Sequence, residues 1–315
     1  MKLPALNIGN LVARIPIIQG GMAVRISTSS LAAAVAEEGG IGLIAATGMA
    51  ADELRHEIRR ARELTSGIIG INVMFAIRDF ALLVKTAIEE KIDLVVTGAG
   101  FSRDIYDWGK QTKTPIVSIV SSAKLAKLAE KLGAAAVVVE GKEAGGHLGT
   151  DRSMKEIVPE VREAVNIPVI AAGGIIDGQD IVEAFRLGAN GVQMGTRFAA
   201  SVESGASLEF KQLYLNANGT VLIKSPVGLP GRAIMNSFVE RILGGDLPKP
   251  TKCDHCLKQC SYTFCILKAL NNAQKGNLLE GLVFSGENVH RIKEILSVKE
   301  IFARLKQEIN SILGE

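Results

Sequence analysis

Eight short apolar runs recur along the chain, and stretches with helical periodicity separate them. The runs are rich in Ile and Val, as strands buried on both faces of a parallel sheet are, and they lie at 15–19, 41–45, 68–74, 94–97, 116–120, 135–140, 169–172 and 191–194. The helical stretches lie at 29–38, 51–64, 80–89, 102–110, 122–132, 154–165 and 180–187. This alternation predicts parallel β/α units, which form either a closed barrel or a doubly wound sheet.

Three features favour the barrel. The repeat is even, no GxGxxG motif follows the first run, and the best phosphate-binding pattern comes late, at the seventh and eighth units. The sequence therefore predicts a TIM (β/α)8 barrel over residues 1–215. A loop or lid with a linker is expected at 216–252, and a C-terminal α-helical cap packed on the barrel is expected at 253–315.

The late pattern lies within residues 168–198, where each of the last two apolar runs ends in small residues. Gly173 and Gly174 follow one run, and Gly195 and Thr196 follow the other. Small residues let backbone N–H groups approach a phosphate, and the N-termini of the following helices favour its charge. Because the loops after strands seven and eight are the usual phosphate site of such barrels, we expect a phosphate-bearing ligand here.

Composition and charge exclude several kinds of partner. The chain has 36 basic and 33 acidic residues in 315, a net charge of +3 and no basic block, which argues against nucleic acid. No apolar run approaches the roughly 18 residues of a membrane span, and the N-terminus has no signal-peptide pattern. We therefore expect a cytoplasmic protein that acts on a small molecule and has no membrane partner; a homodimer stays open.

His147 is the candidate catalytic residue. Of the four histidines, it alone lies at the end of a predicted strand, in a glycine-rich stretch that contains Gly145 and Gly146. Histidine titrates near neutral pH, so it can take a proton from a substrate carbon or deliver one to it. The alternative is a loop histidine bonded to a backbone carbonyl. His56, in a highly charged helix, is expected to face solvent.

Five motifs, in order, resemble the nitronate monooxygenase family, which includes the flavin-dependent bacterial enoyl-ACP reductases. They are QGGM at 19–22, GINVM at 70–74, EGKEAGGHLG at 140–149, IPVIAAGGI at 167–175 and GVQMGTRF at 191–198. The resemblance covers roughly residues 10–210 and continues weakly through FSGENVHRIKEILSVKEI near the C-terminus. It implies a barrel that contains FMN.

The resemblance also implies roles for individual residues. The implied cofactor site consists of Gln19, Gly20, Gly21, Met22, Asn72, Glu140, Gly145, Gly146, Gly173, Gly174, Gln193, Met194, Gly195 and Thr196. Within it, the late glycine loops would hold the FMN phosphate, with Gln193 and Met194 beside them. Met22 would line the isoalloxazine ring, while Gln19, Asn72 and Glu140 would add polar contacts. His147 matches the family's proton-transfer histidine next to the flavin.

Two activities are compatible with the resemblance: oxidation of alkyl nitronates, and NAD(P)H-dependent reduction of an enoyl thioester. The EAGGH motif is closer to the reductases, and Val120 stands where some monooxygenases have a basic residue near the flavin. Family membership favours the monooxygenase, and the sequence ranks the two nearly equal. A non-redox barrel that binds a phosphosugar or phosphonucleotide at the same late site is the remaining alternative.

All four cysteines lie within thirteen residues, with the spacing C-x2-C-x3-C-x4-C: Cys253, Cys256, Cys260 and Cys265. Disulfides are not expected in a cytosolic chain. Zinc is one alternative, but the paired CxxC motifs of zinc ribbons are absent, and one compact run is more typical of iron–sulfur ligation. The spacing also loosely resembles the cluster segment of dienoyl-CoA reductases, which combine FMN with a 4Fe–4S cluster. We expect a 4Fe–4S cluster, with zinc or free thiols as alternatives.

Overall fold

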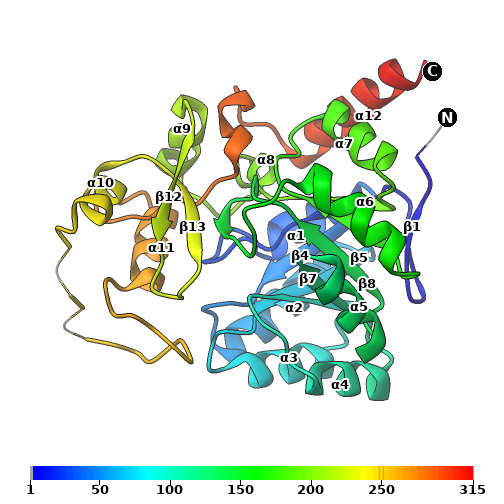
Figure 1. Cartoon of the computed structure of the whole chain (residues 1–315), viewed down its shortest axis with the longest axis horizontal. Helices are drawn as coiled ribbons and strands as arrows, with labels where there is room; N and C mark the ends of the chain where they lie inside the picture. The colour runs from blue at the N-terminus through cyan, green and yellow to red at the C-terminus, as the bar shows by residue number, and fades with distance from the viewer. Residues whose placement is uncertain (1–2, 248, 251, 315) are drawn as a thin grey trace.

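A closed barrel of eight parallel strands forms the centre of the computed structural model, which describes residues 3–247, 249–250 and 252–314 (Figure 1). The strands are β3 (Ile17–Gln19), β4 (Ile41–Ala45), β5 (Ile68–Met74), β6 (Leu94–Gly98), β7 (Ile116–Val120), β8 (Ala136–Glu140), β10 (Val169–Ala172) and β11 (Gly191–Met194). They pair in this order, and β11 closes the barrel on β3. The predicted TIM barrel is confirmed, because each expected run supplies one strand.

Helices between the strands cover the outside of the barrel. They are α1 (Ser29–Glu37), α2 (Ala51–Leu64), α3 (Phe80–Glu89), α4 (Asp104–Thr112), α5 (Ala123–Leu132), α6 (Met154–Ala164) and α7 (Gly178–Arg186). Strand side chains alternate between the helices and the barrel interior. In β5, Ile71 and Val73 pack in the core under the helices, whereas Asn72 and Met74 line a cavity at the mouth. The alternation explains a polar residue in an otherwise apolar strand.

The C-terminus fills the eighth position of the helical ring. α8 (Thr196–Ala199), directly after β11, has four residues and is too short to cover the barrel. α12 (Val298–Leu313) packs against α7 and α1 instead, and Figure 1 shows it beside α7. Its Phe302 is fully buried, with the ring centroid 5.9 Å from that of Phe198. The last predicted helical segment is therefore part of the barrel.

The remaining elements form a second layer, here called the mouth layer, against the C-terminal ends of the strands. It contains α9 (Leu208–Asn216), β12 (Thr220–Lys224), β13 (Pro230–Ile234), α10 (Ser237–Gly244), α11 (Ile266–Gln274) and the 3-10 helix η1 (Glu287–Arg291). Within the stretch 216–252, where a loop or lid and a linker are expected, the structure has the β12–β13 hairpin and α10. Its turn-forming residues make the hairpin connection, while the β-branched stretch TVLIK forms a strand.

The hairpin joins the mouth layer to the barrel. β13 pairs antiparallel with β9 (Gly146–His147), which lies in the loop after β8. At the opposite end of the barrel, β1 (Leu6–Ile8) and β2 (Leu11–Ala13) form a hairpin whose Leu6 and Ile8 belong to the interior core. Among the described residues, no helix is long and apolar enough to cross a membrane.

Candidate active site

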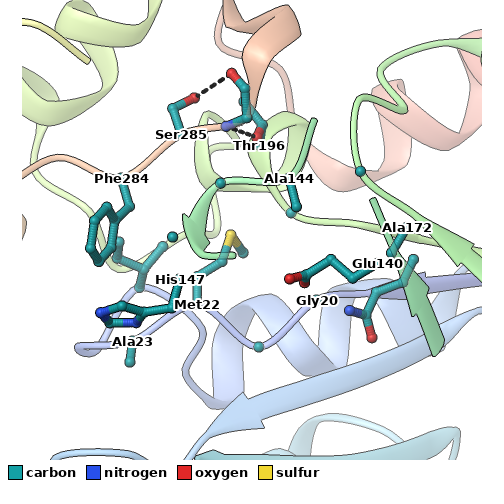
Figure 2. Close-up of a pocket in the computed structure, with 18 of the residues that line it drawn as sticks. Gly20, Met22, Ala23, Glu140, Ala144, His147, Ala172, Thr196, Phe284 and Ser285 are labelled. Atoms are coloured by element: carbon teal, nitrogen blue, oxygen red, sulfur yellow. Dashed lines mark hydrogen bonds between the residues drawn. The ribbon is translucent and has the colours of Figure 1, made fainter. Parts of the chain in front are cut away.

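A cavity of about 280 Å3 lies at the C-terminal mouth of the barrel, between the strand ends and the mouth layer. Most of the expected cofactor residues line it, namely Gly20, Gly21, Met22, Asn72, Glu140, Gly145, Gly146, Gly173, Gly174, Gln193, Gly195 and Thr196, together with His147. In Figure 2, Glu140 and Ala172 lie on one side, while Met22, His147 and Phe284 lie on the other. These residues come from the ends of five strands and the loops that follow them, so distant parts of the chain contribute to one site.

Two of the expected cofactor residues, Gln19 and Met194, are not among the residues that line the cavity. The side chain of Gln19 is fully buried, donating to Ser27 Oγ (2.8 Å) and accepting from the N–H of Leu43 (3.1 Å). Met194 is 1% exposed and belongs to the core. Both side chains point away from the cavity. Through these buried contacts they support the loops that follow their strands and line the cavity.

Steric crowding explains the second glycine of the QGGM motif. A Cβ atom on Gly21 would lie 2.3 Å from Cβ of Asn72, so only glycine lets the loop after β3 pass this close to β5. The loop is also fixed by Ser27, whose Oγ accepts a hydrogen bond from the N–H of Met22 (2.9 Å). The backbone around Met22 therefore forms one wall of the cavity.

Three loops meet at the end of the cavity that the sequence predicts to bind phosphate. Gly173 has a φ of +106°, and a Cβ there would lie 3.2 Å from the N atom of Ala144. The N–H of Gly286 donates to Thr196 Oγ1 (2.9 Å), and Nδ2 of Asn288 donates to the carbonyl of Gly174 (2.7 Å). These small, backbone-rich loops leave space and N–H groups for an anion. Figure 2 shows Thr196 and Ser285 together at this end.

Two polar side chains in the lining have few compensating partners. Gln193 Oε1 is buried and has no hydrogen-bond partner among the described residues. Glu140, at the end of β8, lies near no cation that lowers its pKa, and burial raises its pKa to about 8. At neutral pH this carboxyl group is therefore protonated and able to donate a hydrogen bond. Both groups suit a flat, hydrogen-bonding ligand such as an isoalloxazine ring.

His147 is held in place by the mouth layer. Its Nε2 lies 2.7 Å from Ser225 Oγ in the hairpin connection, and its ring meets Phe284 edge-on with centroids 5.2 Å apart. The hydrogen-bond partner of His147 is thus a serine hydroxyl, and not the backbone carbonyl expected of a purely structural loop histidine. Burial lowers the pKa of His147 to about 4. The imidazole is therefore neutral at pH 7.

Sequence reasoning missed the contribution of the C-terminal segment to this site. Phe284, Ser285, Gly286 and Asn288 all line the cavity. Tyr214 on α9 also lines it and donates from its hydroxyl to the carbonyl of Phe284 (2.6 Å). The signal was present in the stretch FSGEN, which carried the weak end of the family resemblance but was given no site residues.

A second cavity of about 600 Å3 adjoins the first. Ala99, Ile119, Glu140 and His147 line both, so the two cavities meet at the proposed catalytic residue. Most other lining residues of the second cavity are apolar. It also contains Lys258, from the cysteine segment.

The structure does not support the expected metal centre. All four cysteines are free thiols and partly buried. Among the described residues, no group of three or more His, Cys, Asp or Glu side chains is arranged to hold a metal ion. Two of the thiols instead accept backbone hydrogen bonds, Cys253 from His255 (3.3 Å) and Cys260 from Tyr262 (3.4 Å).

Fold and cavity together define a TIM barrel whose mouth holds a cavity lined by glycine-rich loops and a histidine. A family model for nitronate monooxygenase matches residues 7–82 and 76–308. A probable nitronate monooxygenase from Staphylococcus aureus (strain Newman) is 30% identical, and the alignment covers 95% of each chain. The chain belongs to the nitronate monooxygenase family and is an oxidoreductase.

Two solved structures resemble the whole chain. FabK from Thermotoga maritima has 36% sequence identity and a TM-score of 0.87, covering 95% of this chain and 94% of its own. A nitroalkane oxidase from Streptomyces ansochromogenes has 27% identity and a TM-score of 0.82, covering 95% of this chain and 97% of its own. The similarity therefore includes the mouth layer as well as the barrel.

A matched pair of glycine substitutions tests the phosphate end. Gly173 and Gly133 have nearly the same φ, +106° and +105°, but a Cβ on Gly133 would have no neighbour within 4 Å. Alanine at either position costs about 1–2 kcal/mol of backbone strain. We expect Gly173→Ala to weaken FMN binding by at least tenfold and Gly133→Ala to leave it unchanged, measured by fluorescence titration of the apoprotein. Equal affinities in the two variants would contradict the phosphate site.

Proposed function

We propose that this protein is an FMN-dependent oxidoreductase that reduces the double bond of an enoyl thioester with NAD(P)H. The observation that carries the proposal is the second cavity, whose volume of about 600 Å3 adjoins the cofactor cavity at His147. Pockets for drug-sized ligands have about 300–1,000 Å3, so this space suits an acyl chain and exceeds what a small nitronate needs. Among similar structures, FabK, an enoyl-ACP reductase, has the higher sequence identity.

The residues at the mouth fit FMN. The loops at Gly173 and Thr196 would hold its phosphate, and Gln193 and Glu140 would meet the polar edge of its ring system. When bound, FMN supplies hydride-transfer chemistry, which no side chain of the protein can supply. Met22 and Phe284 would cover apolar surface and exclude water from the site.

His147 and Ser225 form the proton-transfer pair. The N–H of Val227 donates to Ser225 Oγ (3.3 Å), which favours the serine hydroxyl as donor to His147 Nε2. In that arrangement the imidazole proton lies on Nδ1, where it can be given to the substrate α-carbon. As Nδ1 gives up its proton, the Ser225 hydroxyl protonates Nε2; solvent then returns one proton to the pair, and the Nδ1–H tautomer is restored before the next turnover.

Nitronate oxidation is the second candidate. It is favoured by the curated relatives, which are named probable nitronate monooxygenases. Val120, however, is buried and lines the second cavity at the position where some monooxygenases have a basic residue near the flavin. Without that cation, the anionic nitronate would depend on the neutral His147 for recognition.

Anaerobic visible spectroscopy separates these activities. The purified protein should be yellow, NADH or NADPH should bleach the flavin bands, and a crotonyl thioester should restore them. Absence of bleaching, combined with oxygen uptake on addition of a nitronate, would instead support the second candidate. A colourless protein that cannot be reconstituted with FMN would leave the non-redox barrel as the better explanation.

His147→Ala tests the proton-transfer assignment. We expect the variant to retain FMN and to lose about 10²–10⁴-fold in kcat, the usual contribution of a positioned acid or base. His56→Ala is the matched control, because His56 is exposed on α2 and lines neither cavity. Unchanged turnover in His147→Ala would remove the assignment.

The pH dependence of kcat/KM should be unusual in two respects: no change near pH 6.5, and a fall above about pH 8. Because the pKa of His147 is lowered to about 4, activity should not change near pH 6.5. Because the pKa of Glu140 is raised to about 8, its ionisation should reduce activity above that pH by placing a negative charge against the cofactor site. Glu140→Gln should abolish the alkaline limb; if the limb persists in that variant, Glu140 is not its origin.

Glu140 also links stability to pH. Its pKa in the folded protein lies above the ordinary value of 4.5, so the folded state binds the extra proton between about pH 4.5 and 8. Between about pH 6.5 and 8, where the lowered pKa of His147 makes no opposing contribution, the free energy of unfolding should therefore fall as pH rises. Apoprotein carrying Glu140→Gln should show a weaker fall.

For the cysteine segment, we keep the 4Fe–4S cluster as a proposal supported by the spacing C-x2-C-x3-C-x4-C alone. Iron and acid-labile sulfide in anaerobically purified protein would support it. One zinc per chain without sulfide would support structural zinc, and neither metal would leave four free thiols.

A further inference from the structure

The second cavity runs along the ends of four neighbouring strands. One end of its lining is formed by Glu140, at the end of β8, and by His147 in the loop that follows. Ile119 of β7, Gly100 after β6 and Phe75 after β5 continue the lining. Because β5, β6, β7 and β8 pair in this order, their ends follow one another around the rim of the barrel. Phe75 therefore lies at the end of the cavity that is farthest from His147 along the rim.

The lining between these two ends is mainly apolar. The barrel contributes Phe101, Ile119, Val120 and Leu125, and the connection between β12 and β13 contributes Val227 and Leu229. Burial of a hydrocarbon chain against such side chains is favourable, and the gain grows with each methylene that leaves water. The cavity is therefore suited to an alkyl chain that extends from the reacting carbons at His147 towards Phe75.

Three neighbours hold the ring of Phe75 in place. Gly100 has a φ of +125°, and a Cβ atom there would collide with Cδ1 of this ring, so glycine lets the loop after β6 lie directly against it. The ring of Phe80 meets it edge-on, with centroids 5.2 Å apart. Nζ of Lys258 lies 3.4 Å from its centroid, as in a cation–π contact. The ring has therefore little freedom to turn aside for a ligand.

The backbone of the cysteine segment brings Lys258 to this ring. The N–H of Lys258 donates to the carbonyl of Ala76 (2.9 Å), directly after Phe75, and Leu257 forms an antiparallel bridge with Ile77. A lysine over an aromatic face is attracted to it through its charge, and an arginine can make the same kind of contact. These contacts place the ammonium group on the face of Phe75, where it steadies the ring.

We propose that Phe75 limits the length of the alkyl chain that the second cavity accepts, and that Lys258 is a positioning residue that keeps its ring in place. The proposal rests on the proposed function in one respect, namely that the substrate reacts beside His147; it applies equally to an enoyl thioester and to a nitronate. A chain that starts there gains burial with every methylene until it meets the fixed ring. Further methylenes stay in water and add nothing to binding. Phe75 is thus a specificity-determining residue that touches no reacting atom.

Equilibrium binding of unreactive ligands measures this limit. Saturated N-acetylcysteamine thioesters from butanoyl to dodecanoyl have no double bond to reduce, and isothermal titration of the protein as purified, with its cofactor, gives a Kd for each. In the wild type we expect Kd to fall about fourfold per buried methylene and then to level off. In Phe75→Ala the fall should continue to longer chains, with Kd unchanged for the shortest. Lys258→Met should shift the limit in the same direction by less, and Lys258→Arg should keep it.

Phe75→Leu is the variant to use if Phe75→Ala does not retain FMN, because leucine fills more of the space and should lengthen the accepted chain by less. Lys85→Met and Trp108→Ala are the matched controls. Nζ of Lys85 lies 4.9 Å from the centroid of the Trp108 ring, so the two residues form the same kind of contact, and neither lines either cavity. Both controls should keep the wild-type limit.

An unchanged limit in the Phe75 variants would overturn the proposal, as would equal weakening of all chain lengths, which a general packing defect would produce. If the limit moves but neither enoyl thioesters nor nitronates are turned over, the proposed function fails and the length limit stands. If turnover is present but Kd of the wild type does not depend on chain length, the proposed function stands and the length limit fails.

Discussion

The closure of the parallel barrel is the constraint on which the site depends. Because all eight strands run in one direction, their C-terminal ends meet at a single rim, and residues from Gly20 to Thr196 come together there. The close approach of Gly21 to Asn72 shows how little space the rim leaves, since even one methyl group would collide. The ring of helices stabilises this closure, and α12 completes it from the far end of the chain.

The second determinant is the low polarity of the mouth. Burial works in opposite directions on the two titratable groups, raising the pKa of Glu140 and lowering that of His147, and the result is the same neutral state at pH 7. A pair of neutral groups can donate hydrogen bonds to a ligand without placing net charge beside it. This suits the hydride and proton transfer proposed above.

The mouth layer converts an open barrel rim into an enclosed site. β13 pairs with the short strand that holds His147, and Ser225 in the same hairpin bonds to its imidazole. The segment at Phe284 covers the ring and continues to the phosphate loops, where Gly286 donates to Thr196. The cysteine segment packs on the loop after β5 and brings Lys258 to the second cavity. One layer thus contacts His147, the loops at Gly174 and Thr196, and the second cavity.

The sequence by itself determined the barrel and most of the rim. Strands and helices were predictable because each is a local pattern, with β-branched runs for strands and 3.6-residue periodicity for helices. Rim residues such as Gly173 and Glu140 were predictable because their place follows from being at a strand end.

Only the tertiary structure decided which side chains and strands contact one another when they lie far apart in the chain. The Ser225–His147 bond, the place of Asn288 beside Gly174 and the turning of Gln19 away from the cavity depend on contacts between remote segments. The hairpin at 220–234 was hidden for the same reason, because short strands are stabilised by their partners, and its partner β9 lies more than seventy residues earlier. The sequence shows the spacing of the four cysteines but not the arrangement of their thiols in space, because spacing along a chain does not determine the direction in which each side chain points.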